Sequence, residues 1–307
     1  MLLERFGFRA MGSPCQIQLW GESRSTLEPV FRRCAEEIQR LEHKFSRYRA
    51  DSLASRIKAS AGDPNGIEVD DETALLLDFA ATAHTESGGR FDPTSGVLRR
   101  IWDFKSNRLP SSDEIALVLP LVGWQEIVWE RPRLVLPRTG MELDFGGFVK
   151  EYAADRVAEL CRSLGVHAGL VDLGGDLAVV GPHPGGDPWL IGIRDPRSPE
   201  RAIARVAVSQ GGLATSGDYE RFIIVDGERY PHIMDPRTGQ SFRDGPACVS
   251  VVAPLCLLAG VTSTIAMLHE ENEAGPFLAE LGLSHLTIDQ AGRIRGDAVV
   301  LEPSAAA

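Results

Sequence analysis

The amino-acid sequence predicts an α+β fold made as a single domain, with mixed or antiparallel sheets and packed helices. Strand-like and helix-like segments are interspersed along its 307 residues, which is the pattern of one mixed core. No segment repeats at a fixed period, and no stretch rich in Gly, Ser or Pro separates two regions. The domain is therefore expected to span residues 1–303, with a frayed tail over residues 304–307.

The N-terminal half is predicted to contain several helices and short strands. A loosely alternating strand over residues 12–20 precedes a helix over residues 27–41, in which apolar residues recur at helical spacing. Asp51-Ser52 provides an N-cap for a short helix that runs through Ile57. The other elements expected in this half are a helix over residues 70–84, a turn at Asp92-Pro93, a helix over residues 112–119 and two short strands within residues 126–136.

The C-terminal half is predicted to be richer in strands. Leu143 begins a strand that leads through glycines into a helix over residues 150–164, and Gly165 is the C-terminal stop of that helix. A Gly-Gly-Asp turn at residues 174–176 separates the next two strands. Further strands are expected at residues 189–194, 202–208, 248–252, 285–288 and 298–301, and a helix rich in small residues at 257–268.

Composition and charge exclude several classes of function. The net charge is 32 − 43 = −11, which disfavours non-specific binding to nucleic acid or to an anionic membrane. The five cysteines are an odd number without a CxxC pair, so reduced thiols are expected and neither a disulfide framework nor a zinc site is predicted. No run approaches the roughly 20 apolar residues of a membrane span.

The N-terminal residues MLLERFGFRAMGSPC carry charges and lack the apolar centre of a signal peptide. A cytoplasmic location is therefore expected for the chain as written. Export is the alternative if the true start of translation lies upstream.

The most informative stretch of the chain is residues 213–239, where an apolar run at residues 222–225 is flanked by polar clusters. Asp226-Gly227 favours a tight primed turn, so the chain is expected to form a hairpin there. The turn would bring the two polar clusters side by side, which makes this end of the hairpin a candidate site. The clusters consist of Thr215, Ser216, Asp218, Tyr219, Glu220 and Arg221 before the run, and His232, Asp235, Arg237 and Thr238 after it.

Five ordered segments carry a resemblance to a known family. They are the N-terminal MGS, SRYRADSLASRI, FDPTSGVLRRIWDF, LDFGGFVKEYAADRVAELCRSLGVHAGLVDLGGDLAVVG and the hairpin TSGDYERF…HIMDPRTG. Together they resemble the ApbE-type FAD:protein FMN transferases over roughly residues 10–270. The resemblance implies an ApbE-like domain and magnesium-dependent transfer of FMN from FAD to a threonine hydroxyl of a target flavoprotein, with release of AMP.

The resemblance also implies which residues bind FAD and Mg²⁺. Contacts to FAD are expected from Met11, Tyr48, Phe91, Asp92, Asp144, Lys150 and Ile233, and contacts to the metal from the Gly147 carbonyl and from Thr264. Asp144, Gly147 and Lys150 stand at a predicted helix start, where backbone N–H groups and the positive end of the helix suit a phosphate. The structural alternatives are a tight turn with a surface lysine, a packed Met11, a core or rim aromatic at Tyr48 and simple turn chemistry at Asp92.

Two residues of the hairpin are expected to act in catalysis. A threonine hydroxyl that attacks FAD needs a group to accept its proton near neutral pH, and His232 is the candidate. Arg221 would neutralise charge on the pyrophosphate in the transition state. The alternatives are a histidine that holds the turn and a salt-bridged arginine.

The sequence departs from the family pattern at two positions. The family's C-terminal metal motif reads Leu-Ala-Asp-Ala-x-x-Thr, and here Gly260 stands where the aspartate is expected, while Thr264 is kept. Glu151 follows Lys150 where glycine is common. Asp172, Asp176 or a water would complete the metal shell, or the chain belongs to a branch with altered metal use. The functional alternatives are an FAD pyrophosphatase that forms FMN and AMP, and a non-catalytic FAD-binding maturation protein.

Overall fold

The computed structural model describes residues 1–298, and within them the expected α+β class is confirmed. The chain forms two compact units, each assembled from separate segments. Unit 1 comprises Met1–His43, Phe148–Tyr219 and the segment from Gly245 onward, and unit 2 comprises Lys44–Gly147 and Glu220–Asp244. The extent of a single domain over residues 1–303 stays a prediction, and the tail at 304–307 lies outside the described residues.

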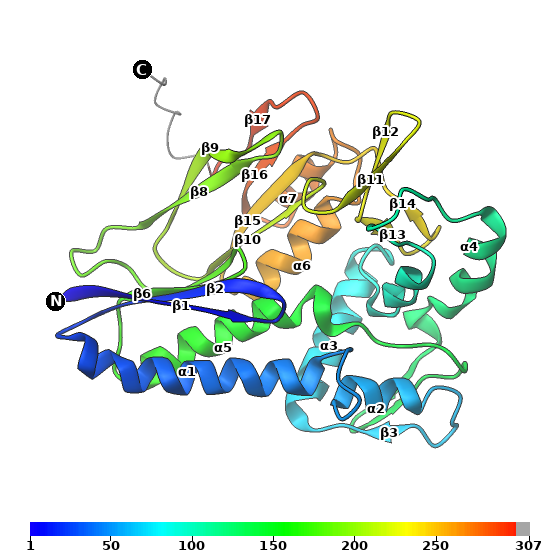
Figure 1. The fold of residues 1–307 in the computed structure, drawn as a ribbon, viewed down its shortest axis with the longest axis horizontal. Helices are drawn as coiled ribbons and strands as arrows, with labels where there is room; N and C mark the ends of the chain where they lie inside the picture. The colour runs from blue at the N-terminus through cyan, green and yellow to red at the C-terminus, as the bar shows by residue number, and fades with distance from the viewer. Residues whose placement is uncertain (299–307) are drawn as a thin grey trace. The chain divides into compact units, whose positions relative to one another are not determined.

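Unit 1 is built on one antiparallel sheet (Figure 1). In spatial order its strands are β1 (Leu2–Ala10), β2 (Ser13–Gly21), β6 (Gly169–Leu173), β7 (Asp176–Gly181), β10 (Gly212–Gly217), β15 (Cys248–Ala253), β16 (Ser284–Ile288) and β17 (Ile294–Arg295). Because side chains alternate between the two faces of a strand, each face of this sheet receives its own apolar set. One face packs against helices and the other against a separate hairpin.

The helical layer of unit 1 consists of α1 (Arg24–Phe45, whose last residues belong to unit 2), α5 (Val149–Ser163), α6 (Cys256–Ala266) and α7 (Ala274–Glu280). α5 packs on β6 and β7, and α6 packs on β10 and β15. α1 lies beside α5 (Figure 1), and the Sγ atoms of Cys34 and Cys161 are 3.4 Å apart between these two helices. Both cysteines are buried and free, as expected for reduced thiols.

The hairpin of β8 (Trp189–Asp195) and β9 (Ser198–Val208) packs on the opposite face of the sheet. Its apolar residues Trp189, Ile193 and Val206 join Leu177 and Leu213 of the sheet in one buried cluster. Unit 1 therefore has a hairpin, a sheet and a helical layer, and the first turn of α5 lies on the helical side.

Unit 2 contains shorter elements. Its helices are α2 (Leu53–Ala59), α3 (Asp71–Glu86), α4 (Ser112–Val118) and the 3₁₀ helices η1 (Pro93–Arg100), η2 (Leu119–Leu121), η3 (Trp124–Glu126) and η4 (Phe145–Gly147). Its strands are β3 (Ile67–Glu68), β4 (Val128–Glu130), β5 (Arg133–Val135), β11 (Phe222–Val225), β12 (Glu228–Pro231), β13 (Met234–Asp235) and β14 (Gln240–Ser241). The expected cap forms at Ser52, which accepts the N–H of Ser55 at the start of α2, and Asp70 accepts the N–H of Thr73 at the start of α3.

The predicted hairpin turn is confirmed. Asp226 and Gly227 join β11 to β12 with φ values of +53° and +81°, which is the backbone of a primed turn. The predicted strand from Leu143 is wrong, because the Asp144 carboxylate accepts the N–H of Gly146 at 2.8 Å and bends the chain into η4. The strand predicted at 298–301 falls almost wholly outside the described residues.

Candidate active site

The residues expected to form the site are divided between the two units, and each group is described within its own unit. Met11, Lys150 and Thr264 belong to unit 1. Unit 2 holds the others, which are Tyr48, Phe91, Asp92, Asp144, Gly147, Arg221, His232 and Ile233. Their assignment to FAD, metal and catalysis stays a prediction, and the structure supplies the local geometry of each.

Lys150 lies in the first turn of α5, and a buried carboxylate holds its ammonium group. Its Nζ lies 2.5 Å from Oδ2 of Asp176, the first residue of β7. Burial works against the charge of Lys150, but Asp176 and Glu151 outweigh burial and raise the pKa of the lysine above its ordinary value. The ammonium group is therefore held in its charged form. The residue itself lies in the first turn of a helix, where backbone N–H groups favour an anion.

Two further carboxylates lie close to this pair. Burial first, and then the Asp176 carboxylate, raise the pKa of Glu151 well above its ordinary value. Burial also raises the pKa of Asp172, whose Oδ1 accepts the N–H of Gly175 at 2.8 Å and so closes the turn between β6 and β7. Lys150 is thus one positive charge among three acidic side chains, and this part of unit 1 favours an additional cation.

Thr264 lies in α6, and its hydroxyl belongs to a small polar cluster. The Oγ of Ser216, at the end of β10, lies 3.2 Å from Oγ1 of Thr264 and 2.9 Å from Oγ of Ser263. Ser216 was one of the polar residues predicted before the hairpin. The structure therefore brings Thr264, a predicted metal contact, next to Ser216 of the polar cluster predicted before the hairpin.

Met11 and Gly12 form the turn between β1 and β2, with φ values of +50° and +75°. A methionine in the left-handed region is uncommon and has to be held there by its surroundings. The Met11 N–H donates to Oε1 of Glu42 on α1 at 2.9 Å, which fixes the turn. The backbone of Met11 is thus constrained by more than packing of its side chain.

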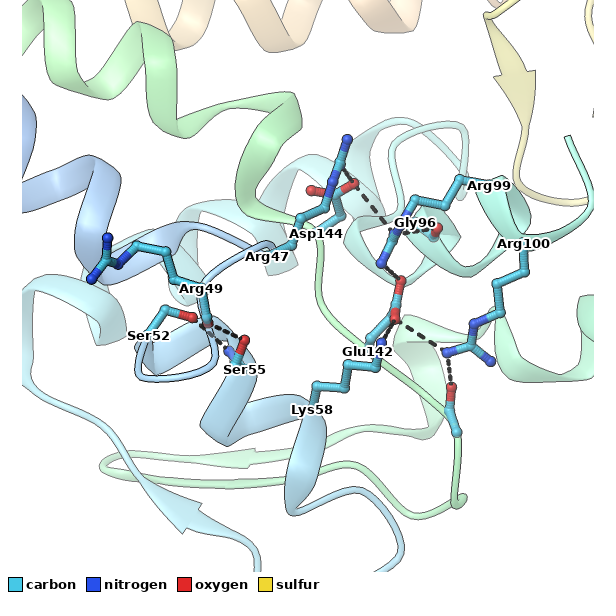
Figure 2. Close-up of polar contacts among 11 residues, drawn as sticks. Arg47, Arg49, Ser52, Ser55, Lys58, Gly96, Arg99, Arg100, Glu142 and Asp144 are labelled. Carbon is cyan, nitrogen blue, oxygen red and sulfur yellow. Dashed lines mark hydrogen bonds and ion pairs between the residues drawn. The ribbon is translucent and has the colours of Figure 1, made fainter. Parts of the chain in front are cut away.

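Asp144 lies in unit 2 between two arginines, as Figure 2 shows. It forms an ion pair with Arg47, and Nη1 of Arg99 lies 3.7 Å from its Oδ2. The Arg47 guanidinium also stacks over the Tyr48 ring, 5.0 Å from the ring centre, and Tyr48 is 83% exposed. An exposed aromatic ring beside an arginine suits a flat, anionic ligand, and its exposure argues against Tyr48 as a core residue.

Glu142 is the centre of a cationic cluster that the sequence-based prediction missed. Its side chain is 2% exposed and lies 3.0 Å from Nζ of Lys58 and 3.1 Å from Nη2 of Arg100, and it pairs with Arg99 as well (Figure 2). Arg99 thereby connects Glu142 to Asp144. The sequence offered one signal for this cluster: Glu142 and Asp144 are two residues apart, a spacing that places both side chains on one side of an extended chain.

Gly96 of η1 leaves room for Asp144, which yields a prediction about this cluster. A Cβ on Gly96 would lie 2.5 Å from Cβ of Asp144 and 2.8 Å from Nη1 of Arg99. Gly96→Ala should therefore displace both side chains and lower the free energy of unfolding by about 1–3 kcal/mol, as measured by urea denaturation. Gly7→Ala is the control, because a Cβ there meets nothing within 4 Å. Equal stability of the two variants would contradict the close packing of Gly96 on Asp144.

Asp92 and Phe91 are both buried, and Asp92 already serves the fold. One oxygen of its carboxylate accepts from the N–H and the hydroxyl of Thr94, and the other accepts the N–H of Trp124 at 3.1 Å. Asp92 thus caps η1 and anchors the segment that contains Trp124. This geometry supports the turn-chemistry alternative for Asp92, while its predicted contact with FAD is untested.

The hairpin brings Arg221 and His232 together, as expected. The carbonyl of Arg221 accepts the backbone N–H of His232 at 3.0 Å, and Nδ1 of the imidazole lies 3.1 Å from the same oxygen. If Nδ1 carries the proton, it donates to this carbonyl and Nε2 becomes the basic nitrogen. The ring of Phe104 meets the imidazole edge-on at 6.4 Å. The imidazole is therefore oriented by contacts on two sides.

The other polar residues near the hairpin have structural partners. Asp218, in unit 1, is buried and paired with Arg197 at 2.8 Å, and Thr215 contacts Ser250 at 2.8 Å. In unit 2, Asp235 and Arg237 form an ion pair at 2.8 Å. The carbonyl of Ile233 accepts the N–H of Phe242 at 2.8 Å. These contacts shape the ends of the hairpin, so only part of the predicted polar clusters remains for a ligand.

Among residues 1–298, no three His, Cys, Asp or Glu side chains gather as a metal-binding group. Magnesium does not require such a group, because it binds through one or two carboxylates together with other oxygens, waters and phosphates. In the same part of the chain, no helix is long and apolar enough to cross a membrane.

The chain is similar to known proteins in both sequence and fold. The family model described as "ApbE family" matches residues 11–287. The FAD:protein FMN transferase of Treponema pallidum is 28% identical over 316 residues, covering 95% of this chain and 86% of that protein, and the one of Chlamydia pneumoniae is 30% identical over 256 residues, covering 81% and 78%. The crystal structure of the ApbE protein of Thermotoga maritima has a TM-score of 0.86 at 30% identity, with 96% of this chain and 97% of that chain covered. The apo flavinyl transferase ApbE of Pseudomonas stutzeri has a TM-score of 0.83 at 28% identity, with 96% and 94% covered. The chain belongs to the ApbE family.

Proposed function

We propose that this protein transfers FMN from FAD to a threonine hydroxyl of a target flavoprotein, with Mg²⁺, and releases AMP. Family membership and relatives named FAD:protein FMN transferase make the chain an enzyme of the flavin transferase class. The metal requirement, the threonine acceptor and the target are the parts that this proposal adds.

The single observation that carries the proposal is the charged state and position of Lys150. Its ammonium group is held by Asp176 at 2.5 Å in the first turn of α5, where it can meet the pyrophosphate of FAD. Within unit 2, Arg47, Arg99 and the exposed Tyr48 ring are cations and a stacking surface of the kind that an anionic, aromatic ligand requires.

The residues of unit 1 fit a magnesium ion by the chemistry of their donors. Oε2 of Glu151 is buried and has no hydrogen-bond partner among the described residues, and the hydroxyls of Thr264 and Ser216 lie in α6 and β10 of the same unit. These are hard oxygen donors, and an oxygen left without a partner marks a place for a cation. A bound Mg²⁺ would neutralise negative charge on the pyrophosphate.

In the proposed reaction, the acceptor hydroxyl attacks the phosphorus atom that carries the riboflavin part of FAD. The new P–O bond links FMN to threonine, the pyrophosphate P–O bond breaks, and AMP leaves with the bonding electrons. The hydroxyl proton passes to Nε2 of His232, which the carbonyl of Arg221 orients through Nδ1 at 3.1 Å. Lys150 stabilises the charge that develops on the phosphates.

The test is incubation of the full chain with FAD, Mg²⁺ and a candidate flavoprotein, followed by in-gel flavin fluorescence and an AMP assay. A fluorescent acceptor and an equal amount of AMP are expected. An acceptor whose threonine is replaced by valine should remain unlabelled, which assigns the attachment site. AMP and free FMN without a labelled acceptor would favour the pyrophosphatase, and bound FAD without either product would favour the FAD-binding maturation protein.

A further inference from the structure

Glu151 has a buried carboxyl group that its described neighbours satisfy only in part. The residue is 8% exposed, and its Oε2 makes no hydrogen bond among the described residues. The neighbouring ammonium group of Lys150 lies 2.5 Å from Asp176, so one positive charge faces two buried carboxylates. A buried carboxylate of this kind is costly unless a partner satisfies it, which suggests that a partner binds there.

The side chain of Glu151 fills the space beside Gly260 where another residue would carry its own side chain. A Cβ built on Gly260 would lie 2.5 Å from Cγ and 3.0 Å from Oε1 of Glu151. Residue 260 can therefore have no side chain while Glu151 keeps this position. The resemblance to the family led us to expect a carboxylate at residue 260 and a glycine at residue 151, and here the two are exchanged between facing helices.

The packing of α5 on α6 holds this arrangement in place. Oδ1 and Oδ2 of Asp155 accept the N–H groups of Cys256 and Leu257 at 2.8 Å and 2.9 Å, so a side chain of α5 caps the N-terminus of α6. Asp155 follows Glu151 by one helical turn, and Cys256 precedes Gly260 by one turn. Two contacts one turn apart therefore set the position of Glu151 against α6.

Oxygen donors lie on the same side of α6 as Gly260. Thr264 follows Gly260 by four residues, which places both on one face of the helix. Its Oγ1 lies 3.2 Å from Oγ of Ser216. One carboxylate with two hydroxyls is a donor set that magnesium accepts when waters and phosphates complete its shell.

We infer that Glu151 supplies the carboxylate ligand of the magnesium site, in place of the aspartate expected at residue 260. This inference rests on the proposed function for its metal, and it names the residue that makes the site complete. The protein then belongs to a branch in which the ligand has moved from α6 to α5.

The experiment measures metal binding directly, with the intact protein and without an acceptor. Mn²⁺ replaces Mg²⁺ as the probe, and its binding is followed by electron paramagnetic resonance with and without FAD, while quenching of flavin fluorescence reports FAD binding. Glu151→Gln should weaken Mn²⁺ binding by about tenfold or more, because affinity for a hard cation depends on ligand charge. It should also abolish the rise of Tm with Mg²⁺, although it leaves the Tm without metal unchanged or higher.

An exchange of the two residues supplies the sharper test. Gly260→Asp alone should be poorly folded because its Cβ meets Glu151, whereas the double variant E151G/G260D should fold and recover Mn²⁺ binding. The matched control E151G/G260N has a side chain of the same size as the aspartate but without its charge, and it should fold but bind Mn²⁺ as weakly as E151Q does.

The outcomes separate this inference from the proposed function. Mn²⁺ binding that depends on Glu151, without FMN transfer to any acceptor, would support Glu151 as a metal ligand and contradict the proposed transferase activity. FMN transfer by wild-type protein, together with an unchanged Mn²⁺ affinity of E151Q, would support the transferase activity and contradict Glu151 as a metal ligand. Absence of Mn²⁺ binding by wild-type protein, with FAD present or absent, would also overturn it.

Discussion

Lys150→Met is expected to abolish detectable FMN transfer and to destabilise the fold at the same time. The ammonium group of Lys150 is the counter-ion of Asp176 at 2.5 Å, and the Asp176 side chain is 7% exposed. Loss of one member of a buried ion pair leaves an uncompensated charge, so the free energy of unfolding should fall by about 3–5 kcal/mol. Loss of a charged donor to the phosphates should lower the rate of transfer by about a hundredfold or more. Urea denaturation and the in-gel fluorescence assay measure the two effects.

A second variant separates the two roles of Lys150. In K150M/D176N the buried carboxylate is removed together with its partner, so most of the lost stability should return. Transfer should stay at the level of K150M, because the positive charge is still missing. Recovery of transfer in the double variant would show that Lys150 acts only through the fold.

Glu142→Gln is expected to destabilise unit 2 by about 1.5–3 kcal/mol, because three cations lose one charged hydrogen-bonding partner. The effect should be smaller than that of Lys150→Met, since Lys58, Arg99 and Arg100 have side chains that are 53%, 35% and 34% exposed and regain water. Displacement of Arg99 should also weaken its ion pair with Asp144 and thereby the binding of FAD. Glu130→Gln is the matched control, because Glu130 is 73% exposed and pairs with Arg133 at only 3.6 Å.

The pH dependence gives an independent check on Glu142. Burial alone would raise the pKa of Glu142, but Lys58, Arg99 and Arg100 outweigh burial and lower the pKa below its ordinary value of 4.5. The pKa is lower in the folded state, so the unfolded state binds more protons and the stabilisation is present above pH 4.5. It is lost as the pH falls through the folded pKa. The difference in Tm between wild-type protein and E142Q should shrink in acid, and a constant difference would argue against this ionised cluster.

Local signals in the sequence predicted a large part of the fold. The Asp226-Gly227 turn, the cap at Ser52 and the glycine turn before β7 each depend on residues next to one another, so the local sequence specifies them. β1 was missed because charged residues dilute its alternation, and only Phe6 and Ala10 of its side chains are buried. α7 was missed because Gly275-Pro276 stands within its short span and is typical of a turn.

The candidate site could be predicted only as residue types. Lys150 was identified by its motif, but its partner Asp176 depends on how α5 packs against β7. The contact between Glu151 and Gly260 joins residues far apart in the sequence, and no local pattern reveals it. Glu142 was overlooked because its three cationic partners come from two segments of unit 2. Which side chains contact each other depends on how the helices and strands pack, and a single sequence does not show this.

The interleaved order of the strands also determines when each strand can find its partner during synthesis on the ribosome. β2 pairs with β6, as in Cys15 with Leu173, so the N-terminal hairpin has to wait until all of Lys44–Gly147 has been synthesised. β10 likewise waits for β15 until Glu220–Asp244 has emerged. Nascent chains therefore carry unpaired strand edges for much of synthesis, a state that is prone to aggregation and that chaperones protect. Neither unit corresponds to a continuous fragment that could be produced by truncation.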